Sequence, residues 1–153
     1  MGLAFEFGEG VQKDSVEAMR WYRMAADRGD PVAQTDLGYL YESGAAGPKD
    51  PGEAAKWYTR GAVSGLARAK FNLGVLYLKG EGVQKNNEEA EHWIGEAADT
   101  GCPDAVKALS YIYRYGWGVS PDPQKAAQLS REASKKNDAK LCMNLDPGPV
   151  AEK

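Results

Sequence analysis

The sequence predicts an all-α fold: a right-handed α-α superhelix of about four helical hairpins with a C-terminal capping helix. Three tryptophans recur at a fixed step of 36 residues, at Trp21, Trp57 and Trp93. Within each 36-residue copy, apolar residues form two separate stripes with the spacing of an α-helix. A fixed period of this length is typical of a solenoid, in which each hairpin buries its apolar faces only against its neighbours.

The repeat keeps its register over four copies without an insertion or a deletion. Other equivalent positions are Gly8, Gly44, Gly80 and Gly116; Ala18, Ala54, Ala90 and Ala126; and Phe5, Tyr41, Tyr77 and Tyr113. We therefore expect one domain over residues 1–145, with repeats at 1–30, 31–66, 67–102 and 103–137 and a cap at 138–145. The Pro/Gly-containing residues 146–153 are expected to be a flexible tail.

The first helix of each repeat is indicated by a single apolar stripe. In the second copy, Ala33, Leu37 and Tyr41 fall on one helical face. Pro31 and Pro103 are expected to open first helices, because the first helical position needs no backbone N–H.

The second helix of each repeat is expected to begin at a capping signal. Asp50 is followed three residues later by Glu53, and Asn86 is followed by Glu89, which is the spacing of a capping box. Asp122 keeps the cap in the fourth copy, but no glutamate follows it at that spacing.

Small residues are expected where the two helices of a hairpin approach. Gly38, Gly74 and Ser110 occupy equivalent positions, and the aromatic residues would then fill the space between hairpins. Gly65 is expected to end its helix, because glycine tolerates a left-handed backbone.

Composition argues against two classes of partner. Lysine and arginine total 19 and aspartate and glutamate 22, a net charge of −3 that disfavours a general nucleic-acid binder. No apolar stretch is long enough to span a membrane, and the N-terminus lacks a signal-peptide pattern. Met1 falls where Leu37 falls in the second copy, so we expect the chain to begin inside a first helix. The cellular compartment is not indicated.

The cysteines and the histidine do not suggest a metal centre or a cofactor site. Cys102 and Cys142 lie 40 residues apart, and we interpret them as two free thiols on adjacent hairpins. His92 is the only histidine, which argues against a Cys/His zinc site. We expect no metal and no cofactor.

The repeat resembles the Sel-1-like repeat, a relative of the tetratricopeptide repeat with a longer unit than 34 residues. The resemblance covers residues 1–137 and is carried by Ala69, Leu73-Gly74, Leu76-Tyr77, Gly80-Glu81-Gly82-Val83, Ala90, Trp93, Ala97-Ala98 and Gly101. Two copies depart from it. Ala45-Ala46-Gly47 replaces the Glu-Gly-Val of other loops, so this loop is expected to bend differently. Leu129 and Ser130 stand where the fourth copy would carry Trp and Tyr.

The resemblance implies a concave face lined by the first helices and used to bind a partner. Positions expected to point into this groove are Leu3, Phe7, Thr35, Tyr39, Ser43, Phe71, Val75, Lys79, Lys107, Tyr111 and Tyr115, flanked by Arg68 and Arg114. Aromatic residues and arginine are the usual anchors of interfaces. We therefore expect a non-catalytic scaffold for a partner protein or peptide, with acidic residues on the partner to complement the cations.

Two alternatives within this hypothesis stay open. Tyr39 and Tyr111 could instead pack between neighbouring first helices. Trp117, in a loop, either tucks over the end of the stack, which we favour, or is exposed for a partner.

No catalytic constellation is evident in the sequence. The Gly80-Glu81-Gly82 segment lacks the spacing of a phosphate-binding loop, and no residue is placed to orient His92 as a base. The alternative function is a hydrolase of β-lactam or cell-wall-related substrates, as linked to some cysteine-rich members of the family. Their cysteine pairs within each hairpin are absent here, so we expect no enzyme activity. A third hypothesis is that the array only packs against another domain.

Overall fold

The computed structural model describes residues 15–135, which form seven α-helices of 13 residues each and no strand. The helices are α2 (Ser15–Asp27), α3 (Pro31–Ser43), α4 (Pro51–Val63), α5 (Ala67–Lys79), α6 (Asn87–Asp99), α7 (Pro103–Tyr115) and α8 (Pro123–Lys135). The predicted all-α array of helical hairpins is confirmed.

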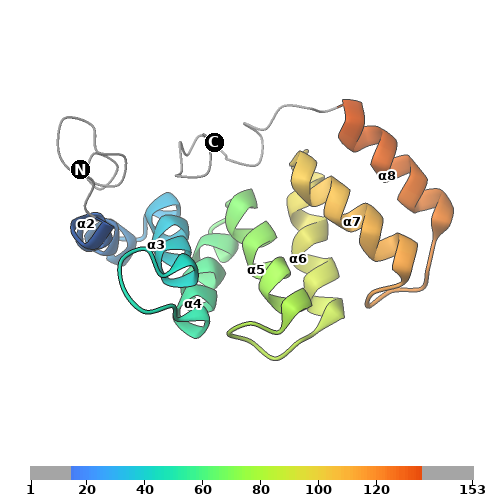
Figure 1. Cartoon of the computed structure of the whole chain (residues 1–153). Coiled ribbons are helices and arrows are strands. Elements are labelled where there is room, and N and C mark those ends of the chain that lie inside the picture. Colours follow the sequence, from blue (N-terminus) through green and yellow to red (C-terminus); the bar gives the residue numbers. More distant parts are fainter. Residues whose placement is uncertain (1–14, 136–153) are drawn as a thin grey trace.

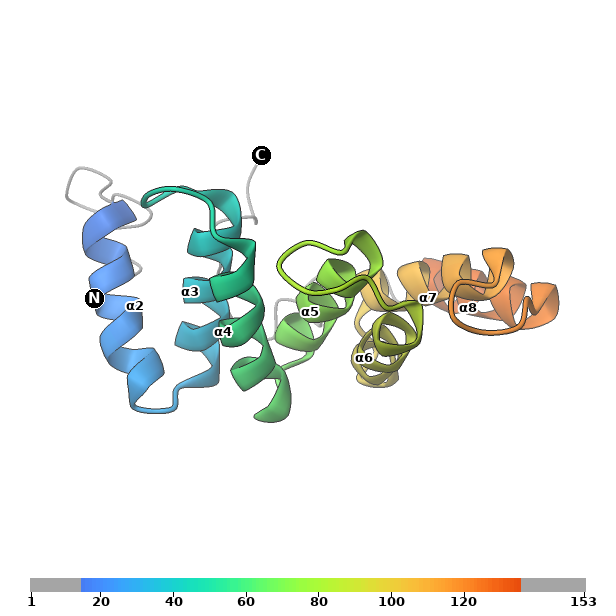
Figure 2. The ribbon, with the colours of Figure 1, turned by 90° about the horizontal axis from the view of Figure 1, so that it is seen from below.

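The helix boundaries follow the period of the sequence. First helices α3, α5 and α7 begin at residues 31, 67 and 103, and second helices α2, α4, α6 and α8 begin at 15, 51, 87 and 123, so every step is 36 residues. Consecutive helices pack against one another, and together they follow an arc from α2 to α8 (Figure 1). Seen from below, α4 lies in front of α3 (Figure 2). We call the exposed surface of α3, α5 and α7 the first-helix face.

The core lies mainly between consecutive hairpins. Tyr58 of α4 shares one buried cluster with Leu73 of α5, and Ile94 of α6 shares another with Leu109 of α7. Burying a side chain of this size stabilises the fold by about 1.5–3 kcal/mol. Neighbouring repeats therefore depend on one another for their stability, as the two-stripe pattern predicts.

Small residues permit the close approach of helices within a hairpin. A Cβ atom added to Gly38 would lie 2.7 Å from the Tyr58 ring, and one added to Gly74 would lie 2.5 Å from Ile94. Ser110, at the equivalent place in the last hairpin, lines a depression together with Ser130 rather than a large residue. Ser130 on α8 is smaller than Tyr58 or Ile94, so it leaves room for Ser110 on α7, which is larger than a glycine.

The predicted N-caps of the second helices are confirmed. The Asp50 carboxylate accepts from the Glu53 N–H at 3.0 Å, and the Asn86 side chain accepts from the Glu89 N–H at 3.1 Å. Asp122 makes the same bond to the fourth-copy helix. Each cap satisfies backbone donors that the helix itself cannot pair.

The reciprocal half of the capping box has a different partner. The Asp50 N–H donates to the Tyr41 carbonyl at 2.9 Å, and the Asn86 N–H donates to the Tyr77 carbonyl at 3.1 Å. The glutamate three residues on is therefore not the acceptor of the cap N–H. These backbone bonds instead tie the start of each second helix to the preceding first helix.

Loops between the helices of a hairpin rest on the preceding second helix. Gly82 has φ 73°, and a Cβ there would lie 2.0 Å from the Pro51 carbonyl oxygen. Ala46 stands at the equivalent position after α3. That loop forms a turn over residues 44–46, whereas the loops after α5 and α7 bend over 81–83 and 117–119. The expected difference in this loop is confirmed.

One interpretation of the cysteines is wrong. Cys102 is fully buried at the start of α7 and is disulfide-bonded, so it is not a free thiol. A separation of one repeat plus four residues gave no sign of this in the sequence. Cys142 lies outside the described residues, as do Leu3, Phe7, the predicted cap at 138–145 and the predicted tail at 146–153.

None of the helices within residues 15–135 has the length and apolar character needed to cross a bilayer. The same residues contain no group of three His, Cys, Asp or Glu side chains placed to hold a metal ion.

Candidate interaction surface

Three exposed aromatic side chains stack at the C-terminal end of α7, and we call them the aromatic ladder: Tyr111, Tyr115 and Trp117. The ring centroids of Tyr111 and Tyr115 are 6.4 Å apart, and those of Tyr115 and Trp117 are 5.4 Å apart. Their planes differ by only 15° and 25°. The three residues are 39%, 57% and 42% exposed, so this apolar surface faces solvent.

Local sequence explains why the rings meet. Tyr111 and Tyr115 are four residues apart on a helix and share one face. Gly116 then ends α7 in the left-handed conformation, with φ 68°, and its N–H donates to the Ile112 carbonyl. The Trp117 N–H donates to the same carbonyl at 3.0 Å. This turn places the Trp117 ring on Tyr115, so the favoured interpretation of a tucked Trp117 is wrong.

Two cations border the aromatic ladder. The guanidinium carbon of Arg114 lies 5.8 Å from the Tyr111 centroid, within the range of a cation–π contact. Lys107 lies one turn before Tyr111 and is exposed. Neither cation forms an ion pair with another residue in the part of the chain that the structure describes. Their charge is therefore available to an acidic group.

A depression lies beside the ladder, between α7 and α8. Its volume is about 380 Å³, and it is lined by Pro103, Asp104, Lys107, Ser110, Tyr111, Arg114, Ser130, Ala133 and Ser134. The predicted residues Lys107, Tyr111 and Arg114 thus do come together, with Tyr115 and Trp117 continuing the surface.

Thr35 is a correction to the predicted groove. Its side chain is fully buried, and its hydroxyl donates to the Pro31 carbonyl at 2.8 Å. A Cβ on Gly61 would lie 2.8 Å from the Thr35 hydroxyl oxygen, so the absent side chain of Gly61 makes room for it. Thr35 therefore packs against α4 and does not face a partner.

Arg68 does not present a free charge to the groove either. Its guanidinium donates to the Asp36 carboxylate at 3.0 Å, and the two side chains are 11% and 3% exposed. This ion pair joins α3 to α5. The ion pair could not be predicted from the sequence, because it does not recur with the repeat. The third and fourth copies carry Asn72 and Ala108 at the position of Asp36.

Apart from Lys79, the remaining predicted positions are less exposed than the ladder. Phe71 packs against the buried cluster of α6 and α7, and Tyr39 and Val75 are half-buried. The Ser43 hydroxyl donates to the Leu40 carbonyl at 3.4 Å. Lys79 on α5 is exposed. Large exposed aromatic groups on the first-helix face are thus concentrated on α7.

The tryptophan of the repeat itself has a different role from Trp117. Trp57 is only 4% exposed, and the guanidinium carbons of Arg60 and Arg23 lie 4.5 Å and 5.8 Å from its ring centroid. The Arg23 contact joins α2 to α4, whereas Arg60 lies on α4 itself. Trp57 is therefore part of the packing between hairpins.

A buried tyrosine carries the clearest change in acidity. The Tyr58 hydroxyl donates to the Glu42 carboxylate at 2.6 Å. Burial raises the pKa of Tyr58 well above its usual value of 10.0, and the nearby Glu42 carboxylate raises that pKa further. Tyr58 therefore stays protonated at neutral pH and acts as a hydrogen-bond donor.

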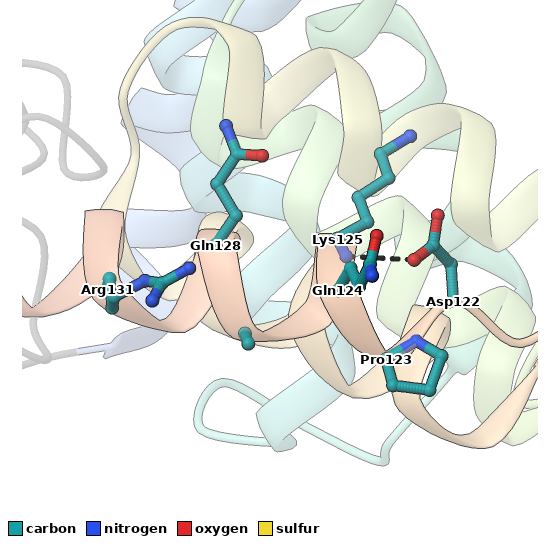
Figure 3. A pocket seen from close by; sticks show the side chains of 7 residues that line it. Asp122, Pro123, Gln124, Lys125, Gln128 and Arg131 are labelled. Atoms are coloured by element: carbon teal, nitrogen blue, oxygen red, sulfur yellow. Dashed lines mark hydrogen bonds between the residues drawn. The ribbon is translucent and has the colours of Figure 1, made fainter.

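A second depression is formed by α8 and its N-cap (Figure 3). It is lined by Asp122, Pro123, Gln124, Lys125, Ala127, Gln128 and Arg131. The Lys125 ammonium donates to the Tyr113 hydroxyl at 2.7 Å, a bond that raises the pKa of Lys125. Because a single helix and its cap supply every lining residue, this surface is an open helix face.

Comparison with known proteins agrees with this architecture. The family model for the Sel1 repeat matches residues 1–30, 31–65, 67–102 and 103–138. No curated protein matches the sequence.

Three solved structures are similar to the chain. A Sel1 repeat protein from Oxalobacter formigenes has 36% sequence identity and a TM-score of 0.83, covering 92% of this chain and 58% of that one. The protein c5321, a protective antigen of uropathogenic Escherichia coli with an SLR fold, has 33% identity and a TM-score of 0.86, with coverages of 94% and 31%. Helicobacter pylori cysteine rich protein B shares the fold, at 16% identity and a TM-score of 0.59, with coverages of 83% and 96%.

The chain thus spans 58% and 31% of the length of the first two structures. Proteins built from these repeats commonly serve as interaction scaffolds. The family model and the similar solved structures agree on the repeat and on the fold, so the chain belongs to the Sel1 repeat family.

Proposed function

We propose that this protein is a non-catalytic scaffold that binds a partner protein or peptide on its first-helix face. The observation that carries the proposal is the exposed stack of Tyr111, Tyr115 and Trp117 beside two unpaired cations. Aromatic residues and arginine supply most of the binding energy at interfaces, because they bury large areas at small entropic cost.

The shape of this surface favours a macromolecular partner. The depression between α7 and α8 is partly open and has charged and polar residues in its lining, and the exposed ladder continues beside it. Small molecules usually bind in enclosed, mostly apolar cavities. A peptide or a protein surface can instead cover the ladder and reach Lys107 and Arg114 at its border.

Affinity capture tests this proposal. The full chain and the double variant Tyr115→Ala/Trp117→Ala are used as baits in lysate of the source cells, and bound proteins are identified by mass spectrometry. We expect wild-type protein to capture a partner that the double variant loses, because each truncation removes an exposed ring and no core contact.

A matched control separates binding from folding. Val63 is an apolar residue of α4 that is 75% exposed, so Val63→Ala removes exposed apolar surface away from the ladder. Val63→Ala should retain the partner, and every variant should keep a thermal midpoint close to wild type. Equal capture by wild type and the double variant would refute the assignment of the binding surface.

The hydrolase alternative has no specific observation in its favour. Cys102 is buried and disulfide-bonded, so it offers no free thiol as a nucleophile. Turnover of a chromogenic β-lactam by purified protein would establish that activity and would require a different site.

A further inference from the structure

Each polar group of the aromatic ladder can donate a hydrogen bond, and the two tyrosine hydroxyls can also accept one. The Tyr111 and Tyr115 hydroxyls and the Trp117 indole N–H have no acceptor among residues 15–135. Arg114 and Lys107 add guanidinium and ammonium donors, which cannot accept a hydrogen bond. Asp104 is the single carboxylate lining the depression, and it lies in the first turn of α7, far along the helix from Tyr115.

A ligand that complements such a surface offers acceptors and apolar groups. A polyproline II helix has no internal hydrogen bonds, so its carbonyl groups remain free to accept. Proline also has no N–H, so a proline-rich segment places no unpaired donor against the rings. An α-helix, by contrast, has already paired its main-chain carbonyls internally, so it could accept hydrogen bonds from the ladder only through its side chains.

An extended ligand suits the row of rings. Neighbouring ring centroids are 6.4 Å and 5.4 Å apart. A polyproline II helix presents residues to one side once per turn of three residues, about every 9 Å, so it runs along the row rather than pairing one proline with each ring. Pyrrolidine rings would pack against the exposed aromatic rings; in other proteins, aromatic-lined grooves recognise proline-rich peptides. A β-strand is a poorer fit, because α7 has no free backbone edge with which it could pair.

Charge complementarity defines the ends of the ligand. Lys107 and Arg114 lie on the same face of α7, seven residues apart, and neither is neutralised by a described residue. A carboxylate next to the prolines would meet these cations. We propose that the aromatic ladder, with Lys107 and Arg114, binds a proline-rich segment in the polyproline II conformation that carries a flanking acidic residue. This inference rests on the proposed function and names the ligand of that surface.

Fluorescence anisotropy on the full chain tests the proposal. The probe is a fluorescein-labelled peptide of six prolines with two glutamates at each end. We expect saturable binding, and we expect a matched peptide with six alanines in place of the prolines to bind at least about tenfold more weakly, the loss of one interface anchor. A glutamine-ended proline peptide should also bind more weakly and show less dependence on salt.

Variants of the protein identify the contacts. Tyr115→Ala should weaken binding by about tenfold, Tyr115→Phe should weaken it by a few fold because it keeps the ring but loses the donor, and Val63→Ala should have no effect. Arg114→Gln should remove most of the preference for glutamate-ended over glutamine-ended peptide. Absence of saturable binding, equal affinity for the alanine peptide, or indifference to Tyr115→Ala would each overturn the proposal.

The experiment also separates this inference from the broader function. If the alanine peptide binds more tightly than the proline peptide and depends on Tyr115, the ligand assignment is overturned while the binding surface stands. If neither peptide binds and affinity capture is also insensitive to the ladder, both proposals are refuted.

Discussion

Two glycines of this chain should respond in opposite ways to an added methyl group. Gly82 has a positive φ, and its Cβ would lie 2.0 Å from the Pro51 carbonyl oxygen. Gly95 lies within α6, and the nearest atom to its Cβ is 3.9 Å away. We expect Gly82→Ala to lower the free energy of unfolding by about 1–3 kcal/mol and Gly95→Ala to raise it by about 0.5–1 kcal/mol.

Urea unfolding of the two variants beside wild type measures these changes. A Gly82→Ala protein as stable as wild type would show that the loop does not rest on the start of α4. A destabilised Gly95→Ala protein would show that this face of α6 is more tightly packed than described.

Tyr58 makes the free energy of unfolding depend on pH in the alkaline range. Its pKa is raised in the folded state, chiefly by burial and further by the Glu42 carboxylate, while the unfolded value is near 10.0. The protonated form therefore stabilises the fold fully below pH 10, and this contribution is lost as the pH rises toward the folded-state pKa. We expect the free energy of unfolding to decrease above about pH 10.

Tyr58→Phe identifies the origin of that decrease. The variant loses the bond to Glu42, so it should be less stable at pH 8 by about 1 kcal/mol. Between pH 9 and pH 11 its urea midpoint should fall less than that of wild type. Parallel curves for the two proteins would assign the alkaline transition to other groups.

Thr35 illustrates what the sequence cannot reveal about a single residue. Its place on the helix suggested the groove, but its burial depends on the missing side chain of Gly61 on another helix. The glycines that end the first helices could be predicted, because Gly44, Gly80 and Gly116 recur at one step along the sequence. All three have positive φ in the structure.

At the scale of the secondary-structure element, the start of a second helix is stabilised by the side chain of its N-cap residue. Asn86 caps α6 through two backbone N–H groups, whereas the Asn86 N–H donates to the Tyr77 carbonyl and not to Glu89. We expect Asn86→Ala to lower the free energy of unfolding by about 1 kcal/mol, and Glu89→Ala to lower it by only a few tenths, about the value of its charge near the helix N-terminus. Thermal or urea unfolding distinguishes them, and equal losses would indicate that a full capping box forms in solution.

The link between α3 and α5 is a buried ion pair. Removing one charge leaves the other in a poorly solvated place, so Arg68→Met should lower the free energy of unfolding by about 3–5 kcal/mol. Adding Asp36→Asn should recover much of this loss, because Asn already occupies the equivalent position 72 in the next repeat. A double-mutant cycle by urea unfolding measures the coupling, and additive losses would contradict direct pairing.

The helix caps could be predicted because they recur in each copy, whereas the ion pair between Asp36 and Arg68 could not. Asp50, Asn86 and Asp122 mark the same position in three copies. Asp36 and Arg68 each occur in only one copy, and their contact follows from the stacking of two hairpins.

At the scale of the whole molecule, periodicity determines the fold and departures from periodicity determine the candidate site. The period places every described helix, since side chains at equivalent positions meet equivalent neighbours. The aromatic ladder is a property of α7 alone, where Tyr111, Tyr115 and Trp117 replace Val75, Lys79 and Glu81 of the previous copy. Their replacement could be seen in the sequence, but their stacking requires the left-handed turn at Gly116.

Site-specific photocrosslinking tests most directly whether this surface binds a partner. The photoreactive residue p-benzoylphenylalanine is introduced in place of Tyr115 in one sample and in place of Val63 in another, in cells that produce the protein. Both positions are exposed, but only Tyr115 belongs to the ladder. We expect a crosslinked adduct of defined mass from position 115 and none from position 63. No adduct from position 115, or the same adduct from both positions, would contradict binding at the aromatic ladder.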